Sequence, residues 1–125
     1  MTHLPYDPYN RNCPTRKLLD RIGDRWTVLI VGALGEGPQR FGEIARRVDG
    51  VSQKMLTQTL RGLERDGLVR RTVFAEMPPR VEYALTPVGQ TLREPLRALE
   101  DWAREYMADI EGARDVYDDA AVNVA

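Results

Sequence analysis

A cluster of polar side chains in the segment SQKMLTQTLRGLERDG is suited to contact nucleic-acid bases. If this segment is a helix with Leu56, Leu60 and Leu63 on its buried side, the opposite side is polar and holds no acidic residue. Arg and Lys suit guanine, Gln suits adenine, and Thr can meet the thymine methyl group. Backbone N–H groups at the start of such a helix can take a phosphate. An ordinary solvated face is the alternative, although it would usually mix both signs of charge. The candidate contacts with double-stranded DNA are Ser52, Gln53, Lys54, Thr57, Gln58 and Arg61.

Two further arginines lie where each can reach a phosphate. Arg25 opens an apolar segment, and Arg40 directly precedes the segment FGEIARRV. For both residues the alternative is a surface ion pair, with Asp24 or Glu43 as partner. We expect Arg25 and Arg40 to contact the DNA backbone.

The segment VRRTVFAEMPPRVEYALTPVG predicts a β-hairpin with a stiff tip. Pro78 and Pro79 remove two backbone donors from the loop, which suits a tip that projects into a partner. Arg80 is then the charged end of the tip, placed for the minor groove or its phosphates. Arg70 and Arg71 are neighbours on the first strand, so at most one of them faces DNA.

Cys13 is a candidate redox-sensing residue. It precedes Pro14 at a predicted helix start and has Arg11, Arg16 and Lys17 nearby. A helix N-terminus and neighbouring cations both lower the pKa of a thiol and favour the reactive thiolate. The alternative is an inert residue packed at an interface. Because the chain has no second cysteine, only a link between two subunits, a mixed disulfide with a small thiol, or alkylation is open to it.

The sequence offers little that could support catalysis. Its one histidine, His3, lies in the N-terminal segment, so a Cys–His pair is not expected. The carboxylates show no paired catalytic spacing, and no Gly-rich phosphate loop is present. A single cysteine also excludes a Cys-based zinc site. We therefore expect no enzyme, no cofactor and no metal. A protein–protein module is a third reading, which an acidic helix face would have favoured.

Charge is distributed unevenly along the chain. Residues 11–97 hold 16 Lys or Arg against 10 Asp or Glu, whereas residues 98–125 hold 2 against 8. A basic body favours an anionic partner. No apolar run approaches the ~18 residues of a membrane span, and the N-terminal segment lacks the apolar centre of a signal peptide. We expect a cytoplasmic protein without a membrane partner.

The elements that must position these residues follow from breaks and caps. A mobile arm, 1–12, precedes a short helix that carries Leu18, Leu19 and Ile22 inward. After Gly23 come a buried helix, the two helices flanking Asp49 and Gly50, and then the hairpin. This order predicts a mainly α fold with a small β-hairpin, a winged helix-turn-helix dimerising through terminal helices. The domain spans 13–110, and 111–125 is an acidic, disordered tail.

The last predicted helix begins at Thr86 and Pro87, ends near Ile110 and carries an apolar stripe. A domain this small offers little surface on which such a helix can fold back, which favours a homodimer over an intrachain core. Pro95 should bend the helix. The predicted dimer interface consists of Leu92, Leu96, Leu99, Trp102, Ala103, Tyr106 and Ile110.

The sequence over about residues 13–110 resembles the HxlR-type branch of bacterial winged-helix regulators, which is related to the MarR group. The markers are CP before the first helix, GDRWT, GPQRF, SQKMLTQTL and, most specifically, PPRVEYALTPVG. The resemblance implies a homodimeric transcription factor on an inverted-repeat operator. Several members of this family sense oxidants or electrophiles through a cysteine near the position of Cys13. A ligand-responsive regulator, with a small-molecule pocket at the dimer interface and an inert Cys13, is the alternative.

Overall fold

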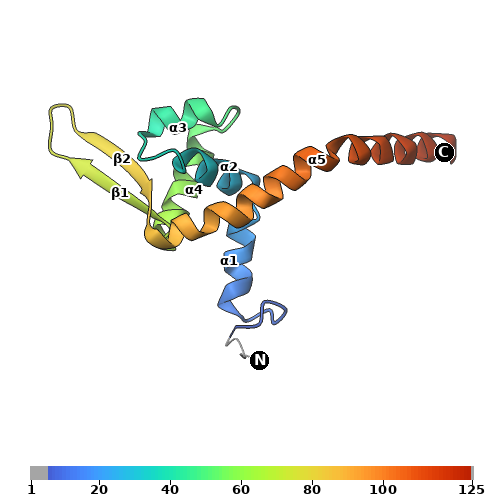
Figure 1. The fold of residues 1–125 in the computed structure, drawn as a ribbon, viewed down its shortest axis with the longest axis horizontal. Helices are drawn as coiled ribbons and strands as arrows, with labels where there is room; N and C mark the ends of the chain where they lie inside the picture. Colours follow the sequence, from blue (N-terminus) through green and yellow to red (C-terminus); the bar gives the residue numbers. More distant parts are fainter. Residues whose placement is uncertain (1–5, 125) are drawn as a thin grey trace. The chain divides into compact units, whose positions relative to one another are not determined.

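The computed structural model of the protein describes residues 6–124 (Figure 1). The chain divides into two compact units, Met1–Arg93 and Glu94–Ala125. The predicted arm, 1–12, lies partly outside the described residues, and His3 lies outside them. Residues 8–12 form turns. Among the described residues no helix is long and apolar enough to cross a membrane.

The first unit holds the elements predicted for a winged helix-turn-helix, in the predicted order. Antiparallel pairing of the two strands confirms the hairpin, and the predicted mainly α fold is confirmed with it. Dimerisation through terminal helices remains a prediction. The elements of this unit are α1 (Pro14–Ile22), α2 (Arg25–Leu34), α3 (Phe41–Arg47), α4 (Gln53–Arg65), β1 (Val69–Phe74), β2 (Arg80–Leu85) and the start of α5 (Pro87–Val124).

The core of the first unit is built on α2, as its apolar sequence predicts. Burying one such aliphatic side chain stabilises the fold by about 1.5–3 kcal/mol. Helices α3 and α4 each contribute buried side chains to this core, so their remaining faces point toward solvent. The most completely buried aliphatic side chains are Ile30, Val31, Leu34, Ile44, Leu56, Leu60 and Leu63.

Local signals set the ends of α4. The hydroxyl oxygen of Ser52 accepts a hydrogen bond from the backbone N–H of Met55 at 3.0 Å, which confirms Ser52 as the N-cap. At the other end Gly67 has φ 74°, a left-handed conformation that favours glycine and ends the helix. Gly50, in the turn between α3 and α4, has φ 87° and is likewise in the left-handed conformation that favours glycine.

The hairpin is joined to the helices at its base and extends away from them at its tip (Figure 1). Tyr83 of β2 exchanges two backbone hydrogen bonds with Gln39, at 2.9 and 2.8 Å, just before α3. Arg80 is the first residue of β2 and pairs with Phe74, so the tip is residues 75–79 and Arg80 lies one step behind it. The predicted placement of Arg80 at the end of the tip is corrected accordingly.

Two predictions about the terminal helices need correction. Leu18 and Leu19 of α1 are 40% and 47% exposed, and α1 has no buried residue, so its leucines do not enter the core of the chain. Helix α5 does not end near Ile110 but continues to Val124, so residues 111–124 are helical rather than a disordered tail. Once a helix is nucleated, each added residue brings its own backbone hydrogen bond, which favours this continuation.

Candidate nucleic-acid interface

The outward face of α4 presents the predicted polar residues together. Gln53, Lys54, Gln58 and Arg61 are exposed, and Thr57 is half-buried. Among residues 6–124 neither Lys54 nor Arg61 has a carboxylate within ion-pair distance. The face therefore offers hydrogen-bond donors and positive charge that forms no ion pair with the described residues.

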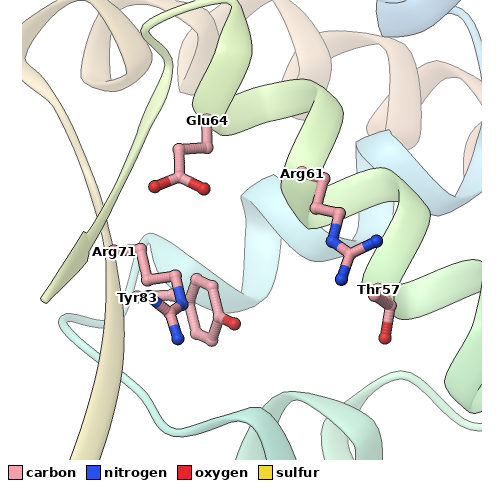
Figure 2. Close-up of a pocket in the computed structure, with 5 residues that line it drawn as sticks. All are labelled: Thr57, Arg61, Glu64, Arg71 and Tyr83. Carbon is pink, nitrogen blue, oxygen red and sulfur yellow. The ribbon is translucent and has the colours of Figure 1, made fainter. Parts of the chain in front are cut away.

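An open pocket lies between α4 and the base of the hairpin (Figure 2). Its volume is about 310 Å³, and it is lined by Thr57, Arg61, Glu64, Arg71 and Tyr83. Figure 2 shows Arg71 beside Tyr83, facing the helix that carries Arg61. Of the two neighbouring arginines on β1, Arg71 is thus the one that lines this pocket. Sequence reasoning left that choice open and missed Tyr83 and Glu64 as pocket residues.

Arg80 is held inside the hairpin by its neighbours. Its guanidinium lies 4.0 Å from the centre of the Phe74 ring, a cation–π contact. It also pairs with Glu76 at 3.2 Å and with Glu82 at 2.9 Å. The exposed apolar side chain at the tip is instead Met77, which is 96% exposed. Both terminal nitrogens of the Arg80 guanidinium are thus paired with carboxylates of the hairpin.

The other predicted phosphate contacts stand at the edges of the helices. The guanidinium of Arg25 lies 4.6 Å from the centre of the half-buried Trp26 ring. Arg40 is exposed, and its backbone N–H donates to the Glu43 carboxylate at 2.9 Å, which caps α3. Within the described part of the chain neither guanidinium forms the ion pair weighed as the alternative.

Cys13 occupies the N-cap position of α1 and is partly exposed. The pKa of its thiol lies below the ordinary value, chiefly because the Thr15 hydroxyl donates a hydrogen bond to the thiolate. Burial, the second-largest cause, opposes this lowering of the pKa, and backbone N–H groups of Thr15, Asp7 and Arg16 add to it. The cause thus differs in part from the neighbouring cations that the sequence suggested.

The predicted stripe of α5 carries large exposed side chains. Leu99, Trp102 and Tyr106 are 52%, 53% and 41% exposed, and the Trp102 and Tyr106 ring centres lie 5.5 Å apart. Leu96 is buried, Leu92 and Ile110 are half-buried, and Ala103 is exposed. A single chain thus leaves much of this apolar stripe in contact with water. Among residues 6–124 no group of three or more acidic, histidine or cysteine side chains could hold a metal ion.

The helix order, the capped α4 and the paired hairpin define a winged helix-turn-helix protein, a DNA-binding fold. The family model for the HxlR-like helix-turn-helix matches residues 21–111, and the chain belongs to this family. It is a transcriptional regulator and not an enzyme.

Relatives of known name agree with this assignment. The chain is 42% identical over 107 residues to YtfH of Escherichia coli (strain K12), an uncharacterized HTH-type transcriptional regulator, covering 86% of this chain and 85% of YtfH. The solved structure of ytfH from Salmonella typhimurium matches with TM-score 0.82 and 38% identity over 88% of this chain and 98% of that one. The redox regulator HypR in its reduced form matches with TM-score 0.72 and 36% identity, over 79% and 98% of the two chains.

Proposed function

We propose that this regulator acts as a homodimer on an inverted-repeat operator and that Cys13 makes its DNA affinity responsive to oxidants or electrophiles. In this proposal α4 enters the major groove and the hairpin enters the adjacent minor groove. The observation that carries the DNA-binding part is the outward face of α4, whose cations form no ion pair with a carboxylate of residues 6–124.

Each predicted contact has a role in this docking. Gln53, Lys54, Thr57, Gln58 and Arg61 approach base edges, and the N-terminus of α4 at Ser52 takes a phosphate. Arg25 and Arg40 contact the backbone, and Arg80 contacts the backbone or minor groove after releasing its carboxylates.

The dimer is supported by the apolar surface that one chain leaves exposed. The α5 stripe is self-complementary in the sense that a two-fold axis brings identical leucine and aromatic side chains together. The exposed leucines of α1 supply a second apolar surface for the same purpose. A two-fold dimer places its recognition helices about 34 Å apart, one turn of DNA, on one face of the duplex.

The sensing part of the proposal is supported by the position and the lowered pKa of Cys13. A thiolate adds directly to an electrophilic carbon, or two Cys13 thiols form an intersubunit disulfide, releasing two protons and passing two electrons to the oxidant. The similar HypR is a redox regulator by name. Modification at the start of α1 would shift α1 in the dimer and change the spacing of the recognition helices.

The test is genomic footprinting of the regulator followed by mobility-shift titration on the sites found. An inverted repeat with half-sites about one helical turn apart supports the proposal. Binding by a monomer, or no preference over random duplex at 0.15 M salt, contradicts it. Loss of affinity after diamide or quinone treatment, absent from Cys13→Ser, tests the sensing part separately.

A further inference from the structure

The pocket between α4 and the hairpin has the hydrogen-bond donors of an anion-binding site. Arg61 and Arg71 reach it from the helix and from β1, and the hydroxyl groups of Thr57 and Tyr83 line the same space (Figure 2). Only Glu64 brings negative charge, so the lining keeps a net positive charge. The guanidinium of Arg71 and the hydroxyl of Tyr83 are suitable donors for a phosphate, and Arg61 adds positive charge on the helix side.

The hairpin side of this pocket is held by hydrogen bonds on both edges of β2. Tyr83 lies opposite Arg71 in the antiparallel pair β1–β2, so both side chains stand on one face of the hairpin. The backbone of Tyr83 is bonded on its other side to Gln39, whose side-chain amide donates to the carbonyl of Ala33 at the end of α2. The base of the hairpin, which forms one wall of the pocket, is therefore tied to the helical core.

Duplex geometry determines what passes over this pocket when the protein is docked. The major and minor grooves are separated by a sugar–phosphate backbone. If α4 lies in the major groove and the hairpin in the adjacent minor groove, that backbone must run between them. The pocket opens at this junction, between the helix and the base of the hairpin.

We propose that this pocket seats a phosphate of the DNA backbone that separates the two grooves, with Arg71 and Tyr83 as its contacts. Arg61 and Thr57 form the helix side of the pocket and stay directed at base edges. The proposal rests on the proposed docking of α4 and the hairpin. Glu64 opposes the phosphate and limits the affinity of the site. Because a phosphate contact carries no base information, the site sets the position of the protein and its salt dependence rather than its sequence preference.

Arg71→Ala is the direct test, with Arg70→Ala as the matched control. Both substitutions remove one arginine from adjacent positions of β1, but Arg70 points to the other face of the strand. Arg71→Ala should lower affinity for operator and random duplex alike, by about tenfold or more. It should also reduce the slope of log affinity against log salt by about 0.9. Equal behaviour of the two variants overturns the proposal.

Two further variants separate the chemistry from a loss of fold. Tyr83→Phe removes one donor and keeps the ring, so it should weaken binding less than Arg71→Ala does. Glu64→Gln should tighten binding to every sequence, because it removes the only negative charge of the lining. Weaker or unchanged binding by Glu64→Gln contradicts a phosphate in this pocket.

The source of the phosphate is tested by competition. Operator affinity is measured in inorganic phosphate and in chloride at matched ionic strength. An equal loss of operator affinity in the two salts supports the duplex as the source of the phosphate. A larger loss of affinity in phosphate than in chloride, if Arg71→Ala abolishes the difference, overturns the assignment to the duplex alone. If wild-type protein binds no duplex at all, the proposed function fails. If it binds and only the Arg71 effect is missing, the pocket proposal alone fails.

Discussion

The guanidinium of Arg21 in α1 forms an ion pair with the carboxylate of Asp66, the C-cap residue of α4, at 2.5 Å. Both side chains are partly buried, at 32% and 21% exposed. The same guanidinium lies against Gly62 of α4, where a Cβ would collide with it. Helix α1, whose N-cap is Cys13, is therefore fixed near its other end to the helix proposed to read DNA.

The contact between Arg21 and Gly62 predicts a non-additive pair of substitutions. Gly62→Ala should displace Arg21 and break its ion pair with Asp66. This loss should offset the roughly 1 kcal/mol by which alanine stabilises a helix interior relative to glycine. In an Arg21→Ala background the collision is gone, so Gly62→Ala should stabilise by about that amount. Urea unfolding of the four proteins measures the cycle.

Gly32→Ala in α2 is the control, because a Cβ there meets nothing within 4 Å. It should be stabilising whether or not Arg21 is present. An additive cycle at Gly62 would show that Arg21 does not press on α4 in solution.

The apolar stripe of α5 predicts that Leu99→Asp disrupts the dimer. Leu99 is half-exposed in one chain, so the substitution should cost the monomer little. In the dimer it would bury an unpaired charge, at a cost of several kcal/mol. Light scattering coupled to size-exclusion chromatography should show a monomer at micromolar concentration. Ala108 lies on the opposite face of α5 from Leu99, so Ala108→Asp introduces the same charge and should leave the dimer intact.

The outward face of α4 predicts a role for Arg61 in sequence preference. Arg61→Ala should weaken operator binding by about 1–3 kcal/mol and relax the preference at one base pair of each half-site. Titrations against a panel of single-base operator variants measure this. A uniform loss across the whole panel would instead place Arg61 on the backbone.

The ion pairs of Arg80 predict a gain of affinity when they are removed. If Arg80 contacts DNA, Glu76→Gln with Glu82→Gln frees its guanidinium and should strengthen binding to all sequences. Arg80→Ala alone should weaken binding to all sequences and flatten the salt dependence. The decisive comparison is the double Gln variant in an Arg80→Ala background, where the gain should shrink. An undiminished gain would mean that the carboxylates repel DNA by themselves and that Arg80 only orders the hairpin.

The Thr15 hydroxyl predicts the pH dependence of Cys13 labelling. A lowered thiol pKa keeps the thiolate populated at lower pH, so the iodoacetamide labelling rate should rise with a midpoint below the ordinary ~8.5. Thr15→Val removes the donor and should move that midpoint to higher pH, whereas Thr15→Ser should retain it. An ordinary midpoint in wild-type protein, with operator affinity unchanged by diamide, would leave Cys13 as a packing residue.

Contiguous residues were enough to predict the order of the helices, the Ser52 cap, the Gly67 stop and the polar face of α4, but not where α5 ends. These features depend on spacing along one helix and on hydrogen bonds that span three or four residues, and both can be read from the chain itself. The hairpin could be predicted for the same reason, from its β-forming residues around a proline pair.

Tertiary structure alone decided which side chains share a surface. The register Phe74↔Arg80 moved Arg80 from the tip into a cluster with two carboxylates, and the pairing Arg71↔Tyr83 selected Arg71 over Arg70 as the residue that faces α4. Strand register and the attachment of Tyr83 to Gln39 join residues far apart in sequence, so no local pattern encodes them. The leucines of α1 show the same limit. Their spacing indicates an apolar face, but only the packed chain shows that this face stays exposed.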